Sequence, residues 1–205
     1  MHRSNSKTVG AVVLCAGQSQ RFGAANKLLA TIDGPTIIER VVRTVVASTV
    51  TEGVVVVGHQ AEALRDRIAE YDVQTVRNPE YATGQSTSVR CGIEYAATEG
   101  WDAAVILLGD MPFVAEDTID RLVAEYRAGA GGIIAPEFDG TRGNPVLFGR
   151  PHFERLRTVS GDKGGREILD THSDVVLVTV DDSGVVRDID TIGDIPAHHS
   201  PSAND

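Results

Sequence analysis

Short, almost continuously apolar runs alternate with longer segments of helical periodicity from residue 9 to about residue 128. The runs are rich in valine, isoleucine and leucine, which is typical of strands buried on both faces. They predict strands at residues 9–16, 53–58 and 103–108, with a shorter one at residues 74–77. Apolar residues at three- and four-residue spacing predict helices at residues 36–50, 61–71, 86–98 and 116–128. This alternation predicts a parallel sheet covered by helices on both sides.

The pattern loosens after Gly129, where glycine-rich connections separate the apolar runs. Further strands are predicted at residues 133–135, 145–148 and 175–180. We expect one domain over residues 1–196, built from a first half at about 9–130 and a second at about 131–196. Residues 197–205 are expected to form a disordered tail. The predicted fold is therefore α/β and Rossmann-like, with three layers and a mostly parallel central sheet.

Composition narrows the possible partners. The chain has 205 residues and a formal net charge of −10, with 41% hydrophobic and 23% charged residues, which suits a globular domain. The negative charge repels phosphate-rich surfaces and so argues against nucleic acid and anionic membranes as partners. No apolar run is long enough for a transmembrane helix, and the two cysteines, Cys15 and Cys91, give no disulfide framework. We expect a cytoplasmic protein.

A glycine-containing loop follows the first predicted strand and reads Ala16-Gly17-Gln18-Ser19-Gln20-Arg21-Phe22-Gly23-Ala24-Ala25-Asn26-Lys27. Open α/β sheets bind ligands at this point, where glycine backbone N–H groups approach phosphates and cationic side chains neutralise them. The loop matches neither the dinucleotide nor the Walker pattern, and an ordinary turn with solvated charges is the alternative. Because the chain has only three lysines among 19 cationic residues, Lys27 indicates a role that arginine cannot fill.

Two aspartate segments also follow apolar runs. Gly109-Asp110-Met111-Pro112 comes directly after the strand predicted at 103–108, and Asp188-Ile189-Asp190-Thr191 follows the last predicted strand. Mg²⁺ takes one or two carboxylates together with phosphate oxygens and water. A helix cap is the alternative role for an aspartate at the end of a strand.

Three polar segments contain further candidates for contacts with substrates. Thr83-Gly84-Gln85-Ser86-Thr87-Ser88 leads into a predicted helix, and capping explains only one of its three consecutive hydroxyl residues, so the others are candidates for reading a base edge. Arg142-Gly143-Asn144-Pro145 and Gly161-Asp162-Lys163-Gly164-Gly165-Arg166 are either surface turns or parts of a site for an anionic acceptor.

Together these segments resemble the molybdenum cofactor nucleotidyltransferases. The stretch from Leu14 to Gly23, followed by Lys27-Leu28-Leu29, is similar to their signature loop, particularly that of the cytidylyltransferases, and Gly-Asp-Met-Pro and Asp-Ile-Asp-Thr also match. The resemblance covers roughly residues 9–195 and implies a nucleotide-diphospho-sugar transferase-like fold. The chain departs from the family at Asn144, where many cytidylyltransferases have histidine, and at Ile192, where proline is usual.

The resemblance implies a role for each candidate residue. The catalytic residues would be Lys27, Arg21 and Asp110, and the metal ligands Asp110 and Asp190. The first half of the chain would bind the nucleotide through Ala16, Gly17, Arg21, Lys27, Gly84 and Ser88. The second half would bind the acceptor through Arg142, Asn144, Lys163 and Arg166.

The reaction that the resemblance implies is Mg²⁺-dependent transfer of CMP from CTP to the phosphate of molybdopterin, with release of pyrophosphate. A client molybdoenzyme or its maturation chaperone is a further implied partner. A guanylyltransferase on the same cofactor would carry two glycines where this chain has Ala16-Gly17. The segment at 161–166 disfavours a sugar or polyol phosphate acceptor. Lys27, Asp110 and Asp190 argue against a non-catalytic cofactor carrier, and the first loop lacks the fingerprint of a dinucleotide-dependent oxidoreductase.

Overall fold

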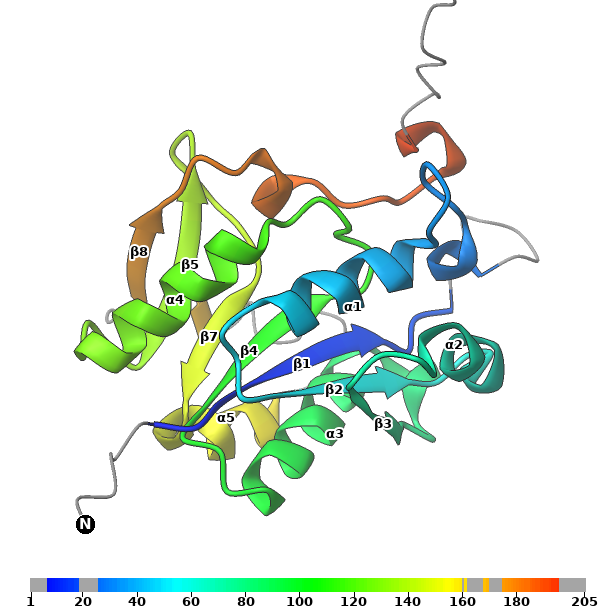
Figure 1. Ribbon diagram of the computed structural model, residues 1–205. Coiled ribbons are helices and arrows are strands. Elements are labelled where there is room, and N and C mark those ends of the chain that lie inside the picture. Colours follow the sequence, from blue (N-terminus) through cyan, green and yellow to red (C-terminus); the bar gives the residue numbers. More distant parts are fainter. Residues whose placement is uncertain (1–6, 19–25, 160, 162–167, 170–174, 196–205) are drawn as a thin grey trace, which may run out of the picture.

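A central sheet runs through the molecule, and its strands come from both halves of the chain (Figure 1). The computed structural model describes residues 7–18, 26–159, 161, 168–169 and 175–195. Within them the strand order is β3-β2-β1-β4-β7-β5-β6, and β8 pairs with β5. The strands are β1 (Val9–Cys15), β2 (Glu52–Val57), β3 (Gln74–Arg77), β4 (Ala103–Leu108), β5 (Ile133–Phe138), β6 (Thr141–Arg142), β7 (Val146–Gly149) and β8 (Val175–Thr179).

The sheet is mostly parallel, which confirms the predicted fold class. β1 lies between β2 and β4 and is parallel to both, β3 continues parallel to β2, and β8 is parallel to β5. β7 is antiparallel to both of its neighbours, β4 and β5, and the short β6 is antiparallel to β5. The reversed strand β7 thus joins the strands of the first half to those of the second in one continuous sheet.

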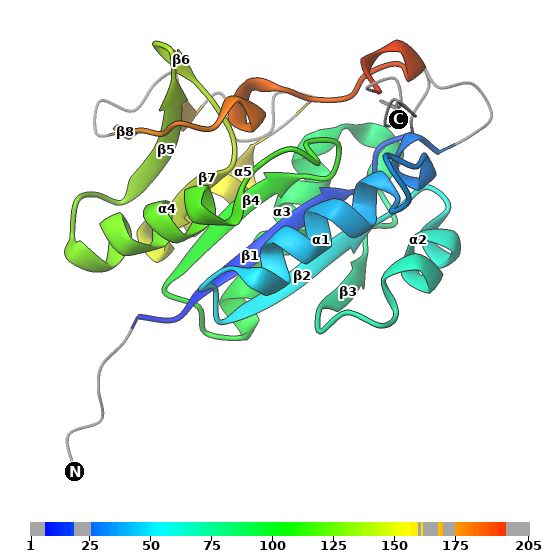
Figure 2. The same ribbon diagram turned by 45° about the horizontal axis from the view of Figure 1, so that its top comes forward.

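Helices cover both faces of the sheet, as Figure 2 shows. They are α1 (Ile37–Ala47), α2 (Ala61–Ile68), α3 (Gln85–Thr98), α4 (Glu116–Ala128) and α5 (Phe153–Thr158). α1, α2 and α4 pack on one face and α3 and α5 on the other, so that two apolar cores lie on either side of the sheet. Alternate residues of β1 enter opposite cores, Val13 with α1 and Val12 with α3, and both are fully buried. Within the described residues, no helix is long and apolar enough to span a membrane.

Most predicted elements are present, with differences at their ends. The helix predicted at 36–50 ends at Ala47, where the next turn is replaced by hydrogen bonds of Thr49 to the Asp120 carboxylate of α4, its backbone N at 2.6 Å. The helix predicted at 61–71 ends at Ile68. The strand predicted at 133–135 extends to Phe138 because β8 pairs along it. α5 was not predicted, since Phe153 and Leu156 are its only buried residues and such a short element shows no periodicity. The tail predicted at 197–205 lies outside the described residues.

The parallel register of β1 and β4 brings two predicted site segments together. Leu14 of β1 is the partner of Leu108 of β4, so both strands end at the same edge of the sheet. The Gly109 backbone N–H donates to the Leu14 carbonyl at 3.0 Å and extends the pairing one residue further. Carboxyl ends of parallel strands are where open α/β sheets bind ligands. Ala16 and Asp110 therefore flank one candidate binding edge.

Candidate active site

A cavity of about 470 Å³ opens at this edge of the sheet. Its walls come from four parts of the chain: the end of β1 with the following loop, the turn at 27–29, the approach to α3, and two segments that carry aspartates. The lining residues are Leu14, Ala16, Gly17, Gln18, Lys27, Leu28, Tyr81, Ala82, Gly84, Gln85, Ser88, Leu108, Asp110 and Asp190. The predicted nucleotide-binding residues Ala16, Gly17, Lys27, Gly84 and Ser88 are thus brought together with both predicted metal ligands, whereas Arg21 lies outside the described residues.

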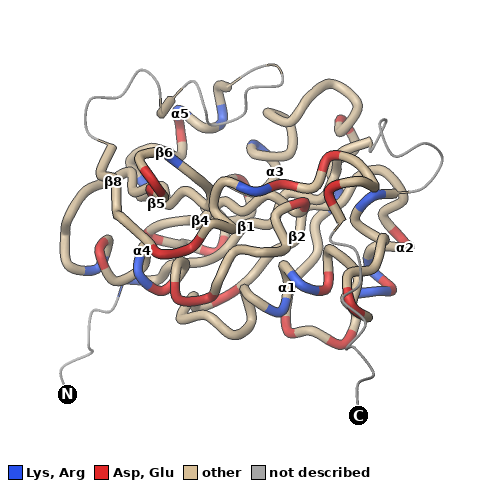
Figure 3. The backbone as a smooth tube through the Cα atoms, turned by 90° about the horizontal axis from the view of Figure 1, so that it is seen from above, with Lys and Arg blue, Asp and Glu red and all other residues tan. Residues whose placement is uncertain are grey.

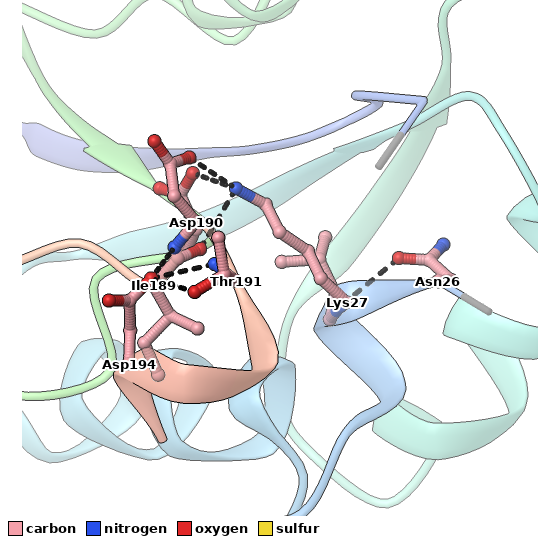
Figure 4. Close-up of polar contacts among 8 residues, drawn as sticks. Asn26, Lys27, Ile189, Asp190, Thr191 and Asp194 are labelled. Carbon is pink, nitrogen blue, oxygen red and sulfur yellow. Dashed lines mark hydrogen bonds and ion pairs between the residues drawn. The ribbon is translucent and has the colours of Figure 1, made fainter. Parts of the chain in front are cut away.

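The Lys27 side chain points at carboxylates of two distant segments (Figure 4). Its Nζ donates to Asp110 Oδ2 at 2.6 Å and to the Ile189 carbonyl at 3.1 Å, and it lies 3.5 Å from Asp190 Oδ1. Asn26 fixes the start of the turn, because its buried Oδ1 accepts from the Leu28 backbone N–H at 3.1 Å. The sequence predicted both Lys27 and Asp110 as site residues, but not that they form an ion pair.

Three carboxylates converge beside this ammonium. Asp110, Asp188 and Asp190 each offer an oxygen, and these oxygens lie within 4.8 Å of one another. Asp110 Oδ1 is buried and has no hydrogen-bond partner in the described structure, which leaves one acceptor of the cluster open for a cation. A divalent ion with a preference for oxygen ligands fits such a donor set, which contains both predicted ligands, Asp110 and Asp190. Asp188 lies in the segment Asp188-Ile189-Asp190-Thr191 but was not predicted as a ligand, because nothing in the local spacing distinguishes it from other aspartates.

The glycine of Gly109-Asp110-Met111-Pro112 allows β4 to end close against β1. A Cβ at Gly109 would lie 2.6 Å from Cys15 Sγ and 2.9 Å from the Leu14 carbonyl oxygen, both too short for non-bonded atoms. Burial raises the pKa of the Cys15 thiol, and the neighbouring Asp110 carboxylate raises it further. Cys15 therefore stays a neutral packing residue, although it lies within the glycine-containing loop region.

The segment that carries Asp188 and Asp190 is fastened to the segment after Asp110. The Ile189 backbone N–H donates to the Asp110 carbonyl at 2.9 Å. In the residues before Ile189, the Arg187 guanidinium stacks over the Phe113 ring at 4.1 Å, and Gly184 packs against the backbone of Phe113. These contacts hold the aspartates together although they lie far apart in the sequence.

Gly184→Ala is expected to lower the free energy of unfolding by about 1–3 kcal/mol, because a Cβ there would approach the Phe113 carbonyl oxygen to 2.1 Å. Urea unfolding measures the difference. Gly193→Ala is the matched control, since its Cβ would only touch Thr191 Oγ1 at 3.6 Å. Equal losses in the two variants would contradict the tight packing at Gly184.

Asp194 fixes the turn that follows Asp190. Its Oδ2 accepts from the Thr191 N–H at 2.7 Å, the Thr191 hydroxyl at 2.9 Å and the Asp190 N–H at 3.0 Å (Figure 4). The bonds from Thr191, and then that from Asp190, hold the pKa of the Asp194 carboxyl below its usual value. The hydrogen bonds of Asp194 therefore fix the backbone next to Asp190, at the point where Ile192 departs from the family pattern.

The approach to α3 contains a buried asparagine that the sequence did not reveal as part of the site. Asn78 Nδ2 donates to Thr87 Oγ1 at 2.8 Å and to Ser88 Oγ at 3.0 Å. Thr87 also donates to the Gly84 carbonyl at 2.8 Å, so this hydroxyl serves the turn. The Ser88 oxygen accepts from Asn78, which turns the Ser88 hydroxyl proton toward other acceptors. Of the three consecutive hydroxyl residues, Ser88 is the one that lines the cavity.

The two described residues of the predicted acceptor side, Arg142 and Asn144, do not line the cavity. Arg142 is exposed on β6, and its Nη1 donates to the Leu169 carbonyl at 3.5 Å. Asn144 donates its backbone N–H to the Val185 carbonyl at 2.8 Å, which ties it to the segment that leads to Asp188. Neither belongs to the described cavity lining. Lys163 and Arg166 lie outside the described residues.

Charges elsewhere on the molecule are mixed. In the part of the chain that the structure describes, lysine and arginine positions are scattered among aspartate and glutamate positions (Figure 3). With a net charge of −10, the molecule does not attract polyanions as a whole. An anionic ligand in the cavity must therefore be held by local groups, of which the Lys27 ammonium is the described cation in the lining.

Comparison with known proteins shows the family of the chain. Residues 11–175 match the model of the MobA-like NTP transferase domain, and the chain belongs to this family. It is 29% identical over 193 residues to nicotine blue oxidoreductase of Paenarthrobacter nicotinovorans, covering 90% of this chain and 93% of the relative. It is also 29% identical over 195 residues to the purine catabolism protein PucB of Bacillus subtilis, covering 88% and 90%.

Solved structures share the fold. Rv0371c of Mycobacterium tuberculosis superposes with a TM-score of 0.78 at 26% identity, over 92% of this chain and 96% of that one. A manganese complex of Rv0371c superposes with a TM-score of 0.71 at 23% identity, over 85% and 89%. The nucleotide-diphospho-sugar transferase-like fold is confirmed, and the chain is a nucleotidyltransferase of the molybdenum cofactor nucleotidyltransferase-like family. A divalent metal ion fits both this family and the aspartate cluster.

Proposed function

We propose that the protein transfers CMP from CTP to the phosphate of molybdopterin in a Mg²⁺-dependent reaction that releases pyrophosphate. The observation that carries the proposal is the single cavity in which Lys27, Asp110 and Asp190 lie beside the predicted nucleotide contacts Ala16 and Ser88. The signature loop and the identity of Ala16 support CTP as the nucleotide. The choice of molybdopterin as the acceptor is supported by the family and by the motifs at 142–145 and 161–166.

In this proposal each part of the site has a separate task. Asp110 and Asp190 hold Mg²⁺, which supplies charge neutralisation at the triphosphate when bound. Lys27 stabilises the negative charge that develops at the α-phosphorus. Gly84 is the N-cap of α3 and has a φ of 123°, and the helix start together with Ser88 binds the base. The acceptor phosphate is already ionised at neutral pH, so positioning contributes more than a strong base.

The two halves of the chain divide the substrates in the same proposal. Residues of about 9–130 hold the nucleotide, with Arg21 as a further phosphate contact. Residues of about 131–196 hold the acceptor through Arg142, Asn144, Lys163 and Arg166. Asn144 is joined through its backbone hydrogen bond with Val185 to the segment that leads to Asp188.

A pyrophosphate-release assay tests the reaction directly. The protein is incubated with molybdopterin and each of the four ribonucleoside triphosphates in turn, in the presence of Mg²⁺. We expect release with CTP well above that with GTP, ATP or UTP, and a nucleotidylated pterin as product. Release with GTP instead would identify a guanylyltransferase on the same cofactor. A parallel incubation replaces molybdopterin by a sugar or polyol phosphate, and release only in that incubation would contradict molybdopterin as the substrate.

Ala16→Gly is expected to shift nucleotide preference from CTP toward GTP. Ala16 is 2% exposed and lines the cavity, and its methyl group takes space that a purine would need. One methyl group in a pocket changes discrimination by about 10- to 200-fold, so we expect a shift of about tenfold in the ratio of kcat/KM values. Steady-state rates with both nucleotides measure this. An unchanged ratio would show that the base is selected elsewhere, for example at Gly84 and Ser88.

A further inference from the structure

Lys27 and a divalent cation would use the same two carboxylates, those of Asp110 and Asp190. The Lys27 ammonium takes up Asp110 Oδ2 at 2.6 Å, and Asp190 Oδ1 lies 3.5 Å away. These two carboxylates belong to the three-aspartate cluster that fits a metal ion. The side chains are partly shielded, Lys27 being 16% and Asp110 23% exposed, so the pair is less screened than a surface ion pair.

Charge balance explains why the ammonium lies there. Three carboxylates within 4.8 Å of one another repel, and a cation among them relieves the repulsion. Lys27 supplies that cation from within the chain. A metal ion that takes over the carboxylates must displace the ammonium, which then needs another anionic partner. A polyphosphate in the cavity that Lys27 lines would offer such a partner.

We infer that Lys27 is an internal cation that competes with the divalent metal for Asp110 and Asp190, so that metal binds tightly only together with a triphosphate. The inference rests on the proposed function for the metal site, but not on the identity of the nucleotide or acceptor. Binding of the metal and of the triphosphate is therefore cooperative, and each increases the affinity for the other by the same factor. This ordering keeps the carboxylates paired until substrate arrives.

The loss of the carboxylate contacts and the gain of a phosphate contact also explain how Lys27 can act in catalysis with little effect on the affinity for the metal–triphosphate complex. Separation of the Lys27 ammonium from the carboxylates costs free energy, and its new contact with phosphate offsets that cost by a similar amount. The net contribution of Lys27 to binding of the metal–triphosphate complex is then small. Its contribution appears instead in the coupling between the two ligands.

Mn²⁺ binding to the full-length chain tests the inference, measured by the electron paramagnetic resonance signal of free Mn²⁺ without any nucleotide. Lys27→Gln is expected to bind Mn²⁺ about tenfold more tightly than the unaltered protein, within the usual range of coupling between sites. Lys27→Arg keeps the positive charge and is expected to bind weakly, like the unaltered protein. Lys7→Gln is the matched control: Lys7 stacks over Tyr126 at 4.5 Å and lies outside the cavity lining, so it reports the general effect of losing one positive charge.

A second titration adds inorganic tripolyphosphate, with its own Mn²⁺ complex measured separately in protein-free buffer. Tripolyphosphate is expected to tighten Mn²⁺ binding about tenfold in the unaltered protein and in Lys7→Gln, and much less in Lys27→Gln. Equal or weaker Mn²⁺ binding by Lys27→Gln, with a melting temperature like that of the unaltered protein, would overturn the inference. An undiminished effect of tripolyphosphate in that variant would overturn it as well. Neither titration contains CTP or molybdopterin, so a failure of the proposed reaction is a separate result.

Discussion

Asp110→Asn is expected to reduce turnover about 1,000-fold or more while the protein remains folded. The amide keeps the size of the side chain but loses the negative charge that a divalent metal requires. Asp110 also provides the closest partner of Lys27, at 2.6 Å, so the variant removes the link between the metal site and the ammonium. Initial rates across a range of Mg²⁺ concentrations, together with a thermal melt, give the measurement.

The control for this variant is Asp181→Asn, which makes the same chemical change at an exposed aspartate of the segment before the cluster. We expect its rate to stay within about twofold of the unaltered protein, as for most surface substitutions. Near-normal activity of Asp110→Asn at ordinary Mg²⁺ would remove Asp110 from the metal site. Activity of Asp110→Asn that is restored only at high Mg²⁺ would support Asp110 as a metal ligand.

Lys27→Ala is expected to lower kcat by about 100- to 1,000-fold, with a much smaller change in the affinity for CTP. A contact that strengthens as charge develops in the transition state affects the chemical rate more than it affects binding. Lys27→Arg is expected to restore only part of the rate, because a planar guanidinium cannot occupy the position of an ammonium. Single-turnover kinetics and calorimetric titration with CTP separate the two effects.

Lys7→Ala serves as the comparison for Lys27→Ala, since Lys7 interacts with the carbonyl and ring of Tyr126 and lies outside the cavity lining. It is expected to turn over normally. If Lys27→Ala loses CTP binding yet keeps its single-turnover rate at saturating CTP, Lys27 is an anchor for the ground-state phosphates. The catalytic assignment of Lys27 would then be wrong.

Local sequence patterns were enough to locate most of the regular elements. The bounds predicted for β3, β4 and α4, at 74–77, 103–108 and 116–128, agree with the structure. Apolar spacing reports which faces are buried, as in β4, which is buried except at its last residue, and in α4, whose buried residues recur at helical spacing. β3 is mostly exposed, and its end was predicted from the Asn78-Pro79 that follows it. Apolar spacing did not reveal α5, whose six residues contain only two that are buried. Ends of helices also moved where a distant side chain replaced the last turn, as Asp120 does for Thr49.

The site was predictable only as separate motifs. The sequence named Lys27, Asp110 and Asp190 from their places after predicted strands, and the family resemblance added Ala16 and Gly84 as base-side contacts. It did not indicate Asn78, whose role depends on Ser88 and Thr87 of the following helix. Nor did it distinguish Asp188 from other exposed aspartates, since a carboxylate becomes a candidate ligand only through its neighbours in space.

By itself, then, the sequence determined the alternation of elements, the parallel sheet and the family, since these depend on patterns between nearby residues. Only the tertiary structure decided that Lys27 pairs with Asp110, a contact between residues 83 positions apart, and that the Ile189 carbonyl completes it from 162 positions away. Such contacts arise where strand register and the anchoring of Gly184 and Arg187 on Phe113 bring chain segments together. Sequence spacing carries no information about them, because the geometry of an ion pair is set by the folded backbone on both sides.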